Sequence, residues 1–138
     1  MKRFDILFET NRFNVSEVGK HFINPCCFGE DFAEWLRQQL TRKGYTAGVP
    51  YQEDWGWEVL AQHGSQRYYL GVSGFLKEDA VGKNAGEWRI MVEKKRSIGE
   101  RLRGRNHMAD SEPILAIVES ILREQTDIRN VRAEFVSL

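Results

Sequence analysis

Residues 57–72 read WEVLAQHGSQRYYLGV, and this stretch has the pattern of a β-hairpin. Gly64 and Ser65 suit a two-residue type II′ turn, because glycine tolerates the positive φ that the first central position of this turn requires. A turn of two residues fixes the pairing of the strands that flank it, so Trp57 is expected to lie opposite Val72.

The predicted register sorts the side chains onto two faces of the hairpin. Continued upstream, it places Trp55 opposite Gly74, where an aromatic ring commonly covers the backbone that glycine leaves bare. The apolar face, which is expected to lie against the core, consists of Trp55, Trp57, Val59, Ala61, Tyr68, Leu70 and Val72. The other face is mixed and mostly polar, and consists of Gly56, Glu58, Leu60, Gln62, Arg67, Tyr69, Gly71, Ser73 and Phe75. This second face is expected to meet solvent or a partner.

Three further segments alternate apolar and polar residues with the period of two that is typical of a strand with one buried face. They are residues 3–9, 87–95 and 129–136. Residues 11–24 have a weaker pattern and are predicted to form either a short strand or an irregular crossover.

Two segments have the apolar spacing of an α-helix. The stripe of the first, within residues 29–44, consists of Phe32, Trp35, Leu36 and Leu40. Gly44 is placed to take a left-handed cap at the end of this helix. The second helix is predicted to run from an N-cap at Ser111 to about Glu124, with Pro113 tolerated in its first turn.

These elements are expected to share one core, because no repeat or Pro/Gly/Ser-rich linker divides the chain. A length of 138 residues suits a single domain over residues 1–138. Two amphipathic helices must bury their apolar stripes, and strands with one apolar face offer the surface for this. The predicted class is therefore α+β, a two-layer sandwich with two helices packed on one face of a mostly antiparallel sheet.

The composition is that of an ordinary globular protein, with 41% hydrophobic and 29% charged residues. No stretch approaches the roughly 18 consecutive apolar residues of a membrane span, so no membrane partner is expected. The acids Asp5 and Glu9 interrupt the N-terminal residues, which therefore lack the apolar stretch of a secretory signal. The expected location is the cytoplasm.

No residue pattern points to a cofactor or a metal, and none is expected. Cys26 and Cys27 are adjacent, which would strain a bridge between them and gives neither a disulfide framework nor metal-ligand spacing, so buried or idle thiols are expected. The histidines His21, His63 and His107 are far apart in the sequence. The phosphate-cradle, zinc-peptidase and nucleophile-elbow signatures are also missing from the sequence.

The first candidate site is the segment Tyr51–Asp54, just before the tryptophan-rich strand. Beside aromatic surface, Glu53 and Asp54 could bind a cation, take a proton or hold an arginine of a partner. Alternatively, Asp54 shapes the local turn through backbone amides while Glu53 is solvated. A third interpretation is that Asp54 pairs with Arg96 or Arg101 and so anchors a long loop.

The second candidate is the basic segment 94–105, KKRSIGERLRGR, which is predicted to be a loop with at most one turn of helix. It has six basic residues and one acid, a local charge of +5, although the whole chain has a net charge of zero. Arginine-rich loops can follow a phosphate backbone. The zero net charge and the lack of an aromatic residue in the segment argue against nucleic acid and favour a solvated or salt-bridged loop.

The third candidate lies on the mixed face of the sheet. There Arg67, Tyr69 and Arg89 are expected near Glu58 and Glu87, where they would form a polar pocket or a protein-binding patch. The alternative interpretation is an ordinary hydrated sheet surface. A second copy of the chain could also cover this face and form an oligomer.

Several of these segments together resemble a group of small bacterial proteins of unknown function. The matching stretches are EDFAEWLRQQLTRKGY (30–45), PYQEDWGW (50–57), YYLGV (68–72), WRIMVE (88–93) and RLRGRN (101–106). The most specific parts are EDWGW at residues 53–57 and the pair Trp88 and Arg89. The resemblance covers a little over half of the chain, and it implies one compact bacterial domain without assigning catalytic residues.

Three functions follow as hypotheses. The first is a non-catalytic module that binds another protein or a small ligand through the mixed face and the Tyr51–Asp54 segment, with inhibitors and immunity proteins as analogues only. The second is an enzyme for a small substrate, with Glu53 or Asp54 as acid or base and Arg89 or an arginine of residues 96–105 holding an anion. The third is nucleic-acid binding through residues 94–105.

Overall fold

The structure is a computed structural model that describes residues 2–25, 27–79 and 81–137. The described part has the α+β class, with a sheet of seven strands and three helices. The strands are β1 (Lys2–Thr10), β2 (Thr46–Ala47), β3 (Tyr51–Glu53), β4 (Gly56–His63), β5 (Gln66–Leu76), β6 (Gly86–Lys94) and β7 (Ile128–Ser137). The helices are α1 (Glu30–Arg42), α2 (Ile98–Leu102) and α3 (Pro113–Arg123).

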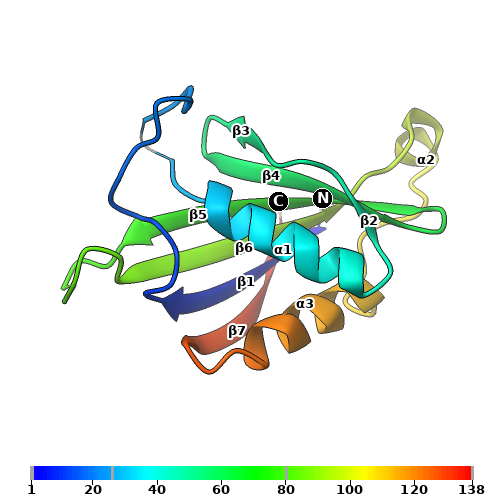
Figure 1. The fold of residues 1–138 in the computed structure, drawn as a ribbon. Helices are drawn as coiled ribbons and strands as arrows, with labels where there is room; N and C mark the ends of the chain where they lie inside the picture. Colours follow the sequence, from blue (N-terminus) through cyan, green and yellow to red (C-terminus); the bar gives the residue numbers. More distant parts are fainter. Residues whose placement is uncertain (1, 26, 80, 138) are drawn as a thin grey trace.

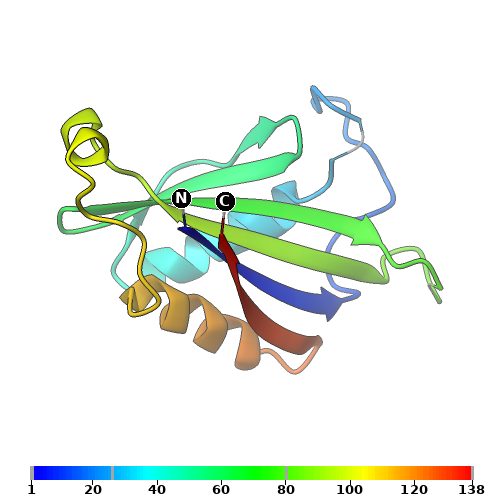
Figure 2. The ribbon, with the colours of Figure 1, turned by 180° about the vertical axis from the view of Figure 1, so that it is seen from behind.

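The strands pair in the order β2-β4-β5-β6-β1-β7, and β3 also pairs with β4. All pairings between the described strands are antiparallel. Figure 1 shows β4, β5, β6 and β1 side by side, with β7 at one edge of the sheet. The helices α1 and α3 lie in front of the sheet in Figure 1 and behind it in Figure 2. The face that points toward the reader in Figure 2 is called the open face below.

The predicted hairpin is confirmed with its register. Gly64 has a φ of 59°, as the turn requires, and Trp57 pairs with Val72. From Trp57 onward, the residues on the core side are therefore those that the sequence predicted. Among them, Val59, Leu70 and Val72 are fully buried.

The prediction for Trp55 is wrong. The chain turns at Asp54 and Trp55, so that Glu53 of β3 pairs with Gly56 of β4, and Trp55 belongs to the turn rather than to the strand. The alternation of faces does not continue through a turn, and Trp55 lies on the open face, where its ring covers Gly71. Gly74 is covered by the ring of Trp88 instead.

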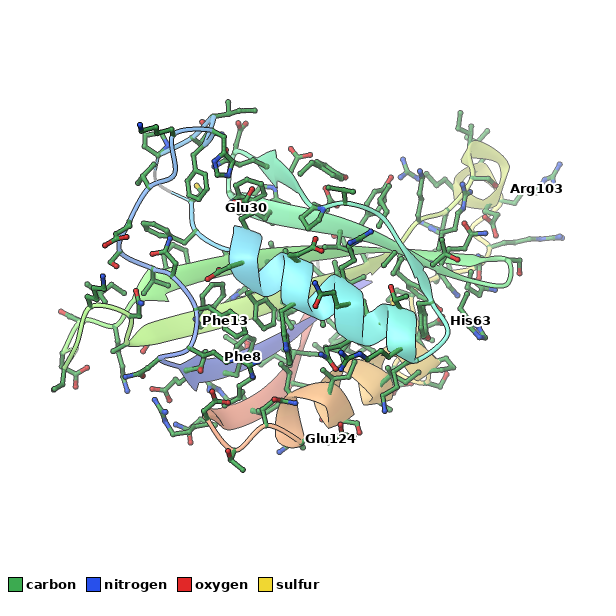
Figure 3. All side chains as sticks on the ribbon, in the orientation of Figure 1. Phe8, Phe13, Glu30, His63, Arg103 and Glu124 are labelled. Carbon is green, nitrogen blue, oxygen red and sulfur yellow. The ribbon has the colours of Figure 1, made fainter. Side chains whose placement is uncertain are left out.

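The helix predicted within residues 29–44 is confirmed as α1, and Gly44 has a left-handed φ of 93°. Residues 11–24 contain no strand and form the irregular crossover that was one of the two predicted alternatives. From this crossover Phe13 reaches the core, and its ring centre lies 4.9 Å from that of Phe32 in α1. Phe8 of β1, labelled with Phe13 in Figure 3, also contacts Phe32, with ring centres 5.1 Å apart.

The second predicted helix is confirmed as α3, but its predicted cap is wrong. The N-cap residue is Glu112 rather than Ser111, and its side chain makes no cap hydrogen bond. The Glu112 carboxylate instead accepts hydrogen bonds from Tyr68 and pairs with Lys94, each at 2.8 Å. The demand for a partner at the buried Lys94 ammonium explains why this carboxylate turns away from the helix.

The prediction of a free thiol at Cys27 is also wrong. Cys27 is buried and disulfide-bonded. The prediction took the strain of a bridge between adjacent cysteines as a reason against a disulfide, whereas strain makes such a bond easier to reduce without preventing it. Cys26 lies outside the described residues. The carbonyl oxygen of Cys27 accepts a hydrogen bond from Trp57 Nε1 at 2.9 Å, which ties the segment before α1 to β4.

Candidate functional site

The open face of the sheet contains a pocket of about 540 Å³. This volume is in the range of small-molecule sites. Its lining comes from β1, β4, β5, β6 and the turn before β4: Arg3, Trp55, Glu58, Tyr69, Gly71, Ser73, Phe75, Arg89, Met91 and Glu93. The pocket is called the open-face pocket below.

The floor of the open-face pocket is apolar, and Gly71 makes it so. A β-carbon at residue 71 would lie 2.3 Å from the Trp55 ring and 3.1 Å from the Met91 methyl group. Only glycine therefore lets the indole lie directly on the backbone of β5. Trp55 remains 40% exposed, so its ring offers apolar contact area to a ligand.

One side of the pocket is acidic and is organised around Glu58. Tyr51 in β3 pairs with Glu58 in β4, and the Tyr51 hydroxyl donates a hydrogen bond to Glu58 Oε2 at 2.8 Å. Burial raises the pKa of Glu58, and the negative charges of Glu53 and Glu93 raise it further. Burial and the hydrogen bond to Glu58 raise the pKa of Tyr51, which keeps Tyr51 protonated as the donor.

Within the described part of the chain, the carboxylates of Glu53, Glu58 and Glu93 have no cationic partner, because no lysine, arginine or histidine forms an ion pair with them. Lys95 lies near this side, with its Nζ 5.6 Å from the centre of the Tyr69 ring, but it forms no ion pair with the three glutamates. The acidic side therefore has unneutralised negative charge next to an apolar floor.

The other side of the pocket is basic and is organised around Asp5, which is fully buried. Asp5 accepts hydrogen bonds from Arg3 at 2.8 and 3.2 Å and from Arg89 at 2.8 Å. One carboxylate thus holds two guanidinium groups. Because Arg89 uses one nitrogen for Asp5 and its side chain is 41% exposed, the rest of its planar donor group faces the pocket.

The structure brings together part of the predicted site. Tyr69 and Arg89 line the open-face pocket together with Glu58. Tyr51 donates a hydrogen bond to Glu58, and Glu53 lies close enough to raise the pKa of Glu58. Sequence reasoning missed Arg3, Asp5, Met91 and Glu93, which also belong to this site. The alternation within residues 3–9 and 87–95 places these four residues on the polar side of their strands. It does not predict that the two strands are neighbours in the sheet.

Asp54 lies outside the open-face pocket. Its Oδ1 accepts a hydrogen bond from Asn24 Nδ2 at 3.4 Å, and its carbonyl oxygen lies 3.2 Å from the sulfur of Cys27. These contacts connect the β3–β4 turn to the segment before α1. A partner of the Asp54 carboxylate is thus a side-chain amide of the crossover, whereas the structural interpretation expected backbone amides.

The basic segment lies at the opposite end of the sheet from Asp54. The length of β4, eight residues or about 26 Å at 3.3 Å per residue, separates Asp54 from the basic segment. Figures 1 and 2 both show α2 far from the β3–β4 turn. A pair of Asp54 with Arg96 or Arg101 is therefore wrong. Arg96 instead donates a hydrogen bond to the carbonyl oxygen of Arg105 at 3.2 Å.

The remaining predicted arginines also lie near α2. Arg67 lines a separate hollow of about 260 Å³ near the β4–β5 turn. Arg101 is exposed on α2, the one-turn helix that the sequence predicted within the basic segment, and Arg103 points outward in Figure 3. Ser97 and Glu100 close the start of this helix with a reciprocal capping box, which gives the loop a defined shape.

Within residues 2–25, 27–79 and 81–137, no group of three His, Cys, Asp or Glu residues is arranged to hold a metal ion. In the same ranges, no helix has both the length and the apolar character needed to cross a membrane. Comparison of the chain with protein-family models, with curated proteins and with solved structures finds no match. The chemistry of the open-face pocket is therefore the guide to function.

Proposed function

We propose that this protein is a non-catalytic binding module, and that its open-face pocket receives a cationic group attached to an apolar body. The observation that carries the proposal is the unneutralised trio Glu53, Glu58 and Glu93 beside the floor formed by Trp55 and Met91. The cation is supplied either by a small molecule or by a basic side chain of a partner protein.

Electrostatics favour a cation over an anion at this site. Around the pocket, Asp5 already neutralises one of the two arginines, whereas the three glutamates have no ion-pair partner among the described residues. A bound ammonium or guanidinium would relieve the mutual repulsion that raises the pKa of Glu58. Aromatic surface next to carboxylates also suits such cations, because a ring attracts positive charge to its face.

The proposal includes the two-layer arrangement expected from the sequence. In this arrangement, α1 and α3 cover one face of the sheet, and the open face is left for a partner. An inhibitor-like or immunity-like role, in which this face covers a basic site on another protein, is consistent with the pocket by analogy only.

A titration with simple cations tests the proposal. Primary amines and guanidinium compounds with an aromatic or alkyl body, for example tryptamine and agmatine, are added to the ¹⁵N-labelled protein. They are expected to shift the amide resonances of Trp55, Glu58 and Gly71, whereas carboxylic acids of the same bodies are not. A peptide with one arginine, tested beside them, distinguishes a protein partner from a small molecule by its relative affinity.

Two matched substitutions locate the binding. Glu58→Gln is expected to weaken binding of the cationic probe by about tenfold or more, because a hydrogen bond to a charged group contributes about 1.5–3 kcal/mol. Glu17→Gln, at an exposed residue of the crossover that does not line the pocket, makes the same change in charge and is expected to leave affinity unchanged. If no cationic probe shifts the named resonances, or if Glu58→Gln binds as the parent protein does, the proposal is wrong.

The proposal also predicts a pH dependence. Binding needs Glu58 ionised, and the pKa of Glu58 in the free protein is raised above its ordinary value of 4.5. Affinity for a permanently charged guanidinium probe is therefore expected to fall, on acidification, at a pH above 4.5. The stability of the free protein changes in the opposite direction, because the cost of ionised Glu58 is present above its raised pKa and is removed as the group is protonated.

Calorimetric titrations between about pH 4 and pH 8 measure this dependence, a range that spans the ordinary pKa of glutamate and neutral pH. Glu58→Gln should flatten the upper part of the profile and should not lower the melting temperature near pH 7. A profile that is identical in the parent protein and in Glu58→Gln would show that Glu58 is not the controlling group.

The enzyme hypothesis has less support from the geometry. It combines Glu53 or Asp54 with Arg89 or an arginine of residues 96–105. Asp54 is turned toward Asn24, outside the pocket that Arg89 lines, which leaves Glu53 beside the pocket as the candidate acid. Substrate contact with both Asp54 and Arg89 would require movement of the β3–β4 turn.

A further inference from the structure

Strand β7 forms an edge of the sheet. It pairs with β1 on one side, and no strand among the described residues pairs with its other side. An edge strand of ten residues presents a row of backbone donors and acceptors that a further strand can use. The second half of β7 is also exposed, and Phe135 has 54% of its surface accessible.

The first part of β7 is blunted, but the second part is regular. Asn130 has a φ of 55°, and the register with β1 shifts between Leu7 and Glu9. Arginine side chains donate to the carbonyl oxygens of residues 130 and 131 there, at 3.0 Å each. From Arg132 to Ser137 the pairing with β1 is continuous. A partner strand centred on this half of β7 meets regular backbone in its middle, and at each end it has to displace the arginine that donates to the carbonyl oxygen of Val131.

We infer that two copies of this chain pair through antiparallel β7 strands, around a twofold axis that passes between the two Ala133 residues. In this register Arg132 of each copy lies opposite Glu134 of the second copy, which gives two opposite-charge pairs. Shifting the centre by one residue to Arg132 or to Glu134 would place like charges directly opposite each other. The charges of β7 therefore select one register.

The other side of the strand is also complementary in this register. Ala133 lies opposite Ala133 of the second copy, and Phe135 lies opposite its Val131. In the monomer Phe135 contacts Phe4 with ring centres 5.2 Å apart, so the pairing would extend the apolar layer from β1 across the edge. A hollow of about 680 Å³ between α3 and the β1–β7 pair, lined in part by Phe4 and Ala133, shows that α3 does not fill the space beside this edge.

The pairing has a consequence for the binding site. A twofold axis perpendicular to the sheet keeps both open faces on the same side, so the dimer presents two open-face pockets in one direction. An interface built mainly from one strand is small, which predicts a dissociation constant of about 1–100 μM. A partner with two basic groups would then bind the dimer more tightly than the monomer.

Charge reversal tests the inference. Sedimentation velocity from about 1 to 500 μM is expected to show a reversible monomer–dimer equilibrium. Arg132→Glu or Glu134→Arg alone turns both charge pairs into repulsions and should weaken dimerisation by about tenfold or more. The double variant Arg132→Glu/Glu134→Arg restores opposite charges across the twofold axis and is expected to dimerise as the parent chain does.

A control and a register test accompany this experiment. Arg103→Glu makes the same charge reversal at the C-cap of α2, far from β7, and should leave the equilibrium unchanged. Ala133→Cys should form a covalent dimer under mild oxidation, because Cα atoms about 4.5–5.5 Å apart suit a disulfide. Ser137→Cys should not, since in this register the two Ser137 residues lie far apart.

The inference is overturned by a chain that remains monomeric at about 500 μM, a concentration well above the dissociation constant expected for such an interface. It is also overturned by a double variant that stays as weak as the single variants, or by equal cross-linking at residues 133 and 137. A dimer that ignores all the β7 substitutions would point to another surface, such as the open face. Circular dichroism of each variant checks that it is folded.

Discussion

Replacement of Glu112 by Ala is expected to lower the free energy of unfolding by about 3–5 kcal/mol, the usual cost of leaving one charge of a buried ion pair without its partner. The Lys94 and Glu112 side chains are only 6% and 11% exposed, and they pair at 2.8 Å. Lys94 also donates to Asn106 at 2.8 Å, and Tyr68 donates to Glu112. Loss of the carboxylate removes a partner from both Lys94 and Tyr68.

Urea unfolding of a double-mutant cycle measures this coupling. Lys94→Met and Glu112→Leu made together replace the pair by apolar groups of similar size, and the double variant is expected to be more stable than either single variant. Because ion pairing and hydrogen bonding lower the pKa of Glu112, its contribution to stability should be lost as the pH falls through that lowered value. If Glu112→Ala costs less than about 1 kcal/mol, water must reach Lys94 and the pair is not a structural anchor.

This ion pair shows what the sequence could not predict. Local patterns were sufficient for the hairpin and for α1, because a two-residue turn fixes a register and an apolar stripe fixes a helix face. Lys94 and Glu112 belong to segments on either side of a loop, and each looks like an ordinary surface residue by itself. Their pairing depends on where that loop returns, which is a property of the tertiary fold.

The same distinction explains the candidate site. Tyr69 and Arg89 could be assigned to the open face, because each lies in a strand with a clear alternation. The contact of Asp5 with Arg89 could not be predicted, because it depends on the pairing of β1 with β6, which lie more than eighty residues apart in the sequence. Trp55 was misplaced because the alternation of β4 was continued upstream into the turn at Asp54 and Trp55, where the faces no longer alternate.

Substitution of Gly56 by Ala is expected to destabilise the fold by about 3 kcal/mol, near the upper end of what overpacking usually costs. A β-carbon at residue 56 would lie 2.2 Å from the backbone carbonyl oxygen of Val72. That oxygen belongs to the centre of the sheet, where β5 is held by β4 and β6, so it cannot move away without breaking strand pairing. Thermal or urea unfolding measures the loss.

Gly71→Ala is the matched comparison, since its β-carbon would meet the Trp55 ring at nearly the same distance, 2.3 Å. Here the obstacle is the end of a side chain that is 40% exposed and can swing into solvent. The expected loss of stability is therefore below about 1 kcal/mol, whereas binding of the cationic probe should fall because the floor of the open-face pocket is displaced. Equal destabilisation by the two substitutions would mean that Trp55 is fixed by the fold and does not serve mainly as a contact surface for a ligand.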